Sequence, residues 1–186
     1  IGGDISSVKG PFHNTADLIE TGIFENYGIH RLGVAGHPEG SPNISDDELQ
    51  KALDRKNELA VQSDLDIYIE TQFCFDPKPI IAWEEQTRLR GNQLPIRIGL
   101  AGPAKLSTLI RFGLMSGVGP SIQFLKKQAS KMAELLITKD PSEMINALTI
   151  YQAKTPNSCI DGVHFYPFGG FEKTAQYASG LTISLN

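Results

Sequence analysis

The chain has 186 residues, 40% of them hydrophobic and 20% charged, which is the composition of a folded globular domain and excludes a largely disordered chain. Lys and Arg number 17 against 21 Asp and Glu, and the resulting net charge of −4 argues against a nucleic-acid-binding surface. No apolar run is long enough to cross a bilayer, and two cysteines are too few for a disulfide framework, so we expect a cytoplasmic protein without a membrane partner.

The chain opens with Ile1-Gly2-Gly3-Asp4, which has the pattern of a strand end whose beginning is absent. We therefore expect the sequence to be a piece of a longer protein. The carboxylate of Asp4 would serve either as a helix N-cap or as a ligand for a protonated ring nitrogen or a ribose hydroxyl. The sequence alone leaves both interpretations open.

Four short apolar runs predict buried β-strands, and the amphipathic stretches between them predict helices. The strands are expected at 32–35, 67–75, 96–100 and 163–166. The helices are expected at 15–26, 46–61, 79–90, 104–115, 121–137 and 142–151. The helix over 46–61 has the strongest signal, because Ser45 and Glu48 have the spacing of a capping box.

Strands that alternate with helices predict an α/β fold with a parallel sheet. Glycine and polar residues gather after each predicted strand, which is typical of a (β/α)8 barrel of the TIM type or of a doubly wound sheet. One partial and four complete strands correspond to the last four to five βα units of such a barrel. We therefore expect residues 1–186 to form a single domain that is an incomplete barrel. Upstream residues, or a partner chain such as a second copy in a homo-oligomer, would cover its open edges.

Two of the strand ends carry candidate functional side chains. His37 and Glu39 lie in a glycine- and proline-rich loop after the strand at 32–35, where they would act as acid–base groups or metal ligands, or would simply be solvated. Gln72 lies inside an otherwise apolar strand. Because a buried amide must find hydrogen-bond partners, Gln72 would either satisfy a backbone group or face a ligand ring that needs both a donor and an acceptor.

The strand at 163–166 and the capped helix add further candidates. His164 lies between apolar neighbours and is expected to be a hydrogen-bonded core histidine. Tyr166, at the end of the same strand, is placed to stack on a ligand or to hydrogen-bond to it. Arg55 and Lys56 on the capped helix would reach a diphosphate or remain on a solvated face. The sequence contains no phosphate-binding loop, no dinucleotide-binding glycine motif and no zinc-like cysteine spacing.

Several of these segments occur in an order that suggests a family. They are AGHPEGSP at 35–42, ETQFCFD at 70–76, IRIGLAGP at 96–103 and GVHFY at 162–166, preceded by the opening GGD. Together they resemble the second half of the methylenetetrahydrofolate reductases, over nearly the whole chain. The resemblance implies a (β/α)8 barrel that holds FAD at the strand carboxyl ends. It also implies hydride transfer from NADH or NADPH to FAD and then to 5,10-methylenetetrahydrofolate, which gives 5-methyltetrahydrofolate.

The resemblance also implies roles for individual residues. Asp4 and Gln72 match catalytic positions, where Asp4 lies near the flavin and the pterin and Gln72 contacts folate and nicotinamide in turn. Leu106 stands where the family has an aromatic residue that covers the folate. Contacts to FAD are expected at Gly3, Asp4, Asn14, Thr15, Ala35, His37 and Lys56, with Arg55 beside Lys56, and at Tyr166. No metal site is expected.

The chain departs from the family pattern at several positions, which are Gly2, His37, Ser41, Leu106 and Gly170. A divergent subfamily accounts for all of them. The glutamate that donates a proton to folate in the family lies on an early strand and has no counterpart here.

Two other functions compete with the folate reductase. One is a metal-dependent barrel hydrolase built on His37, Glu39 and Asp76. The other is a folate- or flavin-binding protein without catalysis.

Overall fold

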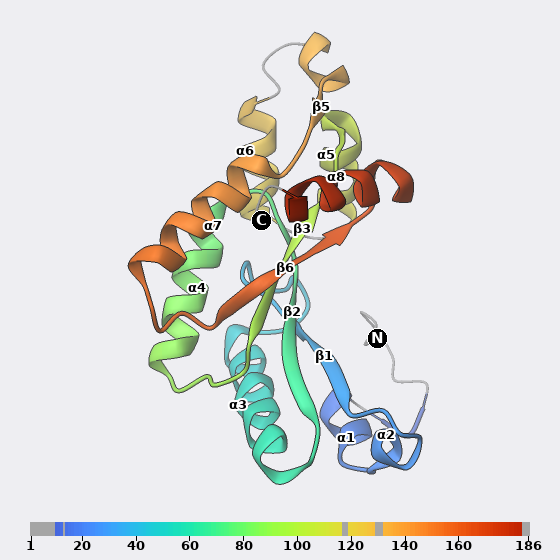
Figure 1. The fold of residues 1–186 in the computed structure, drawn as a ribbon, viewed down its shortest axis with the longest axis vertical. Coiled ribbons are helices and arrows are strands. Elements are labelled where there is room, and N and C mark those ends of the chain that lie inside the picture. The colour runs from blue at the N-terminus through green and yellow to red at the C-terminus, as the bar shows by residue number, and fades with distance from the viewer. Residues whose placement is uncertain (1–9, 13, 117–118, 129–131, 184–186) are drawn as a thin grey trace.

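The computed structural model describes residues 10–12, 14–116, 119–128 and 132–183, and its centre is a parallel sheet (Figure 1). The sheet has four strands in the order β1-β2-β3-β6, and every neighbouring pair is parallel. The strands are β1 (Arg31–Gly36), β2 (Asp66–Cys74), β3 (Ile96–Ala101) and β6 (Ile160–Tyr166). They confirm the four complete strands predicted from the sequence and the α/β class. Within the described residues the sheet has two edges, β1 and β6, and does not close on itself.

Helices connect the strands, as the alternating pattern predicts. They are α1 (Thr15–Ile19), α2 (Ile23–Asn26), α3 (Asp46–Gln62), α4 (Pro77–Leu89), α5 (Leu106–Ser116), α6 (Gly119–Gln128), α7 (Ser142–Lys154) and α8 (Phe171–Ile183), with a 3₁₀ helix, η1 (Met132–Leu136). The predicted capping box of α3 is present, since the Ser45 hydroxyl accepts from the Glu48 N–H and the Glu48 carboxylate accepts from the Ser45 N–H. Within the described part of the chain, no helix combines the length and the apolarity that a bilayer crossing requires.

One face of the sheet is apolar and is covered by helices. Ile69 of β2 and Ile98 of β3 are completely buried, and they belong to one cluster with Leu53 of α3 and Ile80 of α4. Burial of each such side chain contributes about 1.5–3 kcal/mol. This cluster fixes the register of the strands, because a slip by one residue would turn the isoleucines to the opposite face.

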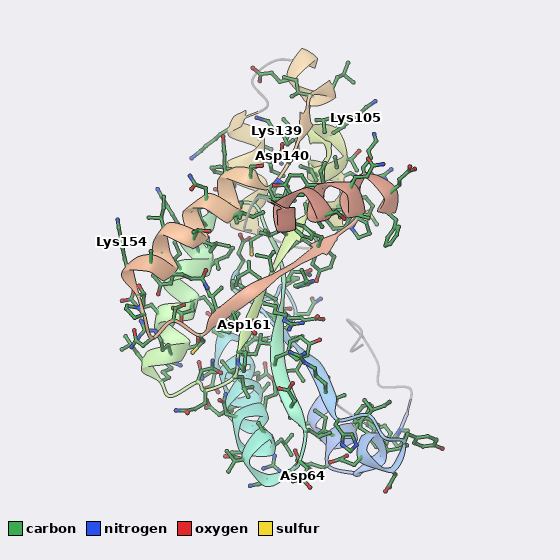
Figure 2. All side chains as sticks on the ribbon, viewed as in Figure 1. Asp64, Lys105, Lys139, Asp140, Lys154 and Asp161 are labelled. Carbon is green, nitrogen blue, oxygen red and sulfur yellow. The ribbon has the colours of Figure 1, made fainter. Side chains whose placement is uncertain are left out.

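The opposite face of the sheet is polar. The Tyr68 ring of β2 lies beneath the guanidinium groups of Arg31 and Arg97, with Cζ-to-centroid distances of 5.2 and 4.5 Å. Arg97 in turn approaches Asp161 of β6 at 3.8 Å, and Asp161 is labelled at the start of that strand in Figure 2. The period-two alternation of each strand therefore separates an apolar layer from a layer of charged and aromatic residues.

Two predicted helices are broken in the structure. The helix expected at 15–26 ends at Ile19 and restarts at Ile23, because Gly22 adopts a left-handed conformation with φ 66°. The helix expected at 121–137 is divided into α6 and η1.

Other elements were not predicted from the sequence. The start of the helix expected at 104–115 is the short strand β4 (Ala104–Lys105), which pairs antiparallel with β5 (Thr138–Lys139). Lys105 and Lys139 mark this pair near the top of Figure 2. The helix α8, which follows the last strand, was also not predicted.

A buried carboxylate joins two helices to the last strand of the sheet. Glu84 of α4 is fully buried. It accepts hydrogen bonds from the Tyr151 hydroxyl of α7 and, at 2.8 Å, from the N–H of Cys159 just before β6, and it pairs with Arg88 at 3.3 Å. The contact with Tyr151 links α4 to α7, which lie side by side in Figure 1. A buried charge with several partners stabilises only while the set is complete.

We therefore expect Glu84→Ala to lower the free energy of unfolding by about 3–5 kcal/mol, since it leaves the Tyr151 hydroxyl, the Cys159 N–H and Arg88 without their carboxylate partner. Urea unfolding of the complete protein measures this. Glu85→Ala is the matched control, because Glu85 is the next residue of α4 and is exposed, and its substitution should cost within about 0.5 kcal/mol. Equal effects of the two substitutions would show that the Glu84 network contributes nothing.

Candidate functional site

The carboxyl ends of the four parallel strands meet at one end of the sheet. Gly36 of β1 lies opposite Thr71 of β2, and Ala101 of β3 lies opposite Tyr166 of β6. The prediction that the strands ending near Ala35, Phe73, Leu100 and Tyr166 are adjacent and parallel is thus confirmed. The fifth strand end of that prediction, with Gly3 and Asp4, lies outside the described residues.

The centre of this end is a β-bulge around Gln72. The register between β2 and β3 shifts between Glu70 and Phe73. At the shift the Thr71 hydroxyl accepts the Gly99 N–H at 2.8 Å, so a side chain replaces a backbone partner. The Gln72 amide oxygen accepts the N–H of Phe73 at 3.4 Å, a long hydrogen bond within its own strand. The bulge thus places a half-buried amide side chain at the strand ends, which is where barrel and doubly wound folds bind ligands.

The bulge depends on a glycine in the neighbouring strand. A Cβ on Gly99 would lie 2.4 Å from the Thr71 carbonyl oxygen, 2.9 Å from the Tyr166 ring and 3.0 Å from His164 Nε2. Gly99 is not among the functional residues predicted from the sequence. The signal was present, however, because an isolated glycine inside a buried strand indicates a bulge or a close backbone approach.

Aromatic side chains surround Tyr166 at the carboxyl end of β6. Its ring lies 5.2 Å from Phe73 in an edge-to-face contact and 5.6 Å from Phe168 in a stacked one, and Phe168 stacks on Phe112 at 4.3 Å. Burial raises the pKa of the Tyr166 phenol, so the ring is neutral at pH 7 and donates its O–H. Leu106 belongs to the same apolar cluster and is completely buried, so it offers no exposed area to a folate in this structure.

Ala35, His37 and Lys56 lie together at the end of β1. The Lys56 ammonium donates to the Ala35 carbonyl at 2.7 Å, and burial lowers the pKa of Lys56 to about 8. Burial, and then the charge of Lys56, lowers the pKa of His37. Among the described residues Lys56 has no carboxylate partner, so this edge presents a half-buried cation beside a neutral imidazole.

The loop that carries His37 does not build a metal centre. Asp76 is used as the N-cap of α4, where its carboxylate accepts the Lys78 N–H at 3.0 Å. Burial, and then the nearby Glu39 carboxylate, raises the pKa of the Cys74 thiol, which places Glu39 against the end of β2. Within the described ranges no three His, Cys, Asp or Glu side chains gather closely enough to hold a metal ion. The trio of His37, Glu39 and Asp76 on which the hydrolase alternative depends is therefore not assembled.

The remaining candidates lie away from this end of the sheet or are already engaged. Arg55 donates to Glu20 at 2.6 and 2.8 Å and to Glu58 at 2.7 Å, and it borders a hollow of about 460 Å³ beside α1. Asn14 caps α1, which begins at Thr15, and exchanges hydrogen bonds with Asp17. These carboxylates already neutralise Arg55 and occupy the start of α1, where a bound diphosphate would have to compete with them.

Comparison with known proteins supports one of the functions considered. No family model matches the chain. The chain is 34% identical over 95 residues to methylenetetrahydrofolate reductase 2 of Saccharomyces cerevisiae, a match that covers 50% of the chain and 15% of that protein. It is 38% identical over 88 residues to methylenetetrahydrofolate reductase 1 of Schizosaccharomyces pombe, covering 47% of the chain and 14% of that protein.

The chain resembles methylenetetrahydrofolate reductases. The resemblance stated from the sequence motifs is thereby confirmed, at identities of 34% and 38% over about half of the chain. The chain spans only about one seventh of the length of the curated relatives it matches.

The close approach at Gly99 generates a prediction about stability. Gly99→Ala should lower the free energy of unfolding by about 1–3 kcal/mol, because the added methyl overpacks the contact with the Thr71 carbonyl. Gly162→Ala is the matched control on the neighbouring strand β6, since a Cβ there meets nothing within 4 Å. It should be neutral or slightly stabilising. The midpoints of chemical unfolding of the two variants test this prediction. Equal midpoints would mean that the strands adjust to the methyl group at Gly99 without a loss of stability.

Proposed function

We propose that this chain is part of a flavin-dependent methylenetetrahydrofolate reductase, and that β1, β2, β3 and β6 are the last four strands of its (β/α)8 barrel. One observation carries the proposal: Ala35 with its partner Lys56, Gln72 and Tyr166 all lie at the carboxyl ends of the strands of one parallel sheet. These are residues to which the family resemblance assigns ligand contacts. Segments outside the described residues, or a second copy of the chain, would complete the barrel.

Gln72 would hold the folate. A pterin edge has both hydrogen-bond donors and acceptors, and a glutamine amide offers a donor and an acceptor from one uncharged planar group. The bulge fixes the backbone at this amide, and a fixed amide orients a ring with little loss of conformational entropy on binding. The catalytic role of Asp4 rests on the resemblance alone.

The residues at the end of β1 fit an anionic flavin cofactor. Lys56 is a half-buried cation that donates to a single carbonyl, so it can still donate to a phosphate. Its neighbour His37 has a lowered pKa, so at pH 7 its neutral imidazole can offer a hydrogen bond, and Lys56 supplies the positive charge. Tyr166 and Phe168 offer aromatic surface to a ring system. When bound, FAD would carry hydride between NADH or NADPH and 5,10-methylenetetrahydrofolate.

The decisive experiment compares wild type with Gln72→Ala in the complete protein. The wild type should copurify with a chromophore that absorbs at flavin wavelengths and should oxidise NADH or NADPH when methylenetetrahydrofolate is added. Gln72→Ala should lower kcat/KM for the folate about 5- to 150-fold, because truncation leaves a pterin polar edge unpaired at a cost of about 1–3 kcal/mol. Flavin content should remain near that of the wild type.

The control is Gln86→Ala, on the exposed side of α4, which should leave the folate kinetics unchanged. A purely structural Gln72 would instead lower the melting temperature of Gln72→Ala and leave the kinetics of the folded protein near wild type. A protein that binds folate or flavin but never oxidises NADH or NADPH would support the non-catalytic alternative.

The lowered pKa of Lys56 predicts how flavin affinity depends on pH. Below pH 8 the ammonium is charged and attracts the diphosphate. Above its pKa of about 8 the charge is lost from the free protein, so affinity for FAD should fall by up to about tenfold per pH unit between pH 8 and 10. His37, whose pKa is lowered, stays neutral throughout this range and adds no slope.

Titration of the flavin-free complete protein with FAD, followed by quenching of flavin fluorescence, measures this dependence. Lys56→Arg should retain affinity at pH 10, because arginine keeps its charge there, whereas Lys56→Met should bind weakly at every pH. A wild-type affinity that is constant from pH 7 to 10 would remove Lys56 from the cofactor site.

A further inference from the structure

The Thr71 carbonyl oxygen at the bulge collects two side-chain donors from β6. His164 Nε2 lies 3.0 Å from this oxygen, and the Tyr166 hydroxyl donates to it at 3.3 Å. Because a carbonyl only accepts hydrogen bonds, His164 must carry its proton on Nε2. Both donors cross β3 to reach β2, and the space for them exists because Gly99 has no side chain.

This carbonyl belongs to the backbone that leads directly into Gln72. A bulge leaves part of the ladder unpaired, and an unpaired buried carbonyl costs about 1–3 kcal/mol. The bulge is therefore stable only if side chains supply the missing donors. His164 supplies the shorter of the two hydrogen bonds, and burial lowers its pKa, so the ring is neutral at pH 7.

We propose that His164 is a positioning residue that sets the backbone at Thr71, and through it the direction of the Gln72 amide. The proposal rests on the proposed function, in which Gln72 holds the folate. His164 itself would touch neither folate nor flavin. It would determine whether the Gln72 amide meets the pterin with its donor and its acceptor in place, so its loss should raise KM for the folate more than it lowers kcat.

The test is a double-mutant cycle in the complete protein. His164→Phe keeps an aromatic ring beside Tyr166 but removes the donor. We expect it to raise KM for methylenetetrahydrofolate about 3- to 10-fold, the effect of one hydrogen bond, with kcat changed less than about twofold. In the Gln72→Ala background the same substitution should change KM less than about twofold, because residues that act through one another are not additive.

A conservative replacement tests the donor itself. The amide nitrogen of His164→Gln stands where Nε2 stood, so this variant should recover most of the wild-type KM. The amide of His164→Asn is too short to reach the Thr71 carbonyl, so this variant should behave like His164→Phe. If His164→Phe does not fold, His164→Asn takes its place in the test. His30→Phe is the matched control, since His30 is an exposed histidine that precedes β1.

The outcomes separate this proposal from the proposed function. An equal rise in KM in both backgrounds, or no difference between His164→Gln and His164→Phe, would overturn the positioning role. If the wild type neither binds folate nor oxidises NADH or NADPH, the proposed function fails. Crystal structures of wild type and His164→Phe then decide the positioning role alone: a shifted backbone at Thr71 and Gln72 supports it, and an unchanged one overturns it.

Discussion

Each strand of the parallel sheet must satisfy two different environments at once. Helices α3 and α4 cover one face, so Ile69 and Ile98 are completely buried there. On the other face, two guanidinium groups lie over the Tyr68 ring, and one of them approaches the Asp161 carboxylate. Because side chains alternate along a strand, the apolar face fixes the register, and the register then fixes which polar residues meet on the other face. The arrangement at the strand ends follows from this constraint.

The bulge at Gln72 interrupts the alternation at the carboxyl end of β2. An extra residue in β2 shifts the register against β3. At the shift the Thr71 carbonyl accepts hydrogen bonds from side chains of β6, and the Thr71 hydroxyl accepts the N–H of Gly99. Such a local defect costs free energy, and it persists because three strands contribute to it. Bulges next to ligand sites commonly redirect a side chain in this way, which links the irregularity of the sheet to the proposed folate contact.

The two basic residues Arg55 and Lys56 are neighbours on one helix, but their side chains lie in different surroundings. Successive residues of a helix point about 100° apart. Arg55 therefore faces α1 and is neutralised by Glu20 and Glu58, whereas Lys56 faces the end of β1 and donates to a carbonyl. In the first case the charge is used for packing two helices together. In the second the charge is left available, at the cost of a lowered pKa.

The sequence by itself determined the α/β class, the four strands and the capped helix α3, because hydrophobic period and capping chemistry are local properties. It also carried the family resemblance, since the motifs that follow the strands can be read in order. It did not predict the break at Gly22, the pairing of β4 with β5 or the helix α8. Only the tertiary structure decided that Leu106 is buried, that Arg55 turns toward Glu20, and that His164 and Tyr166 converge on the Thr71 carbonyl. The physical reason is that these contacts join residues distant in sequence, and their partners depend on strand register and on the space that a glycine leaves, which no local pattern specifies.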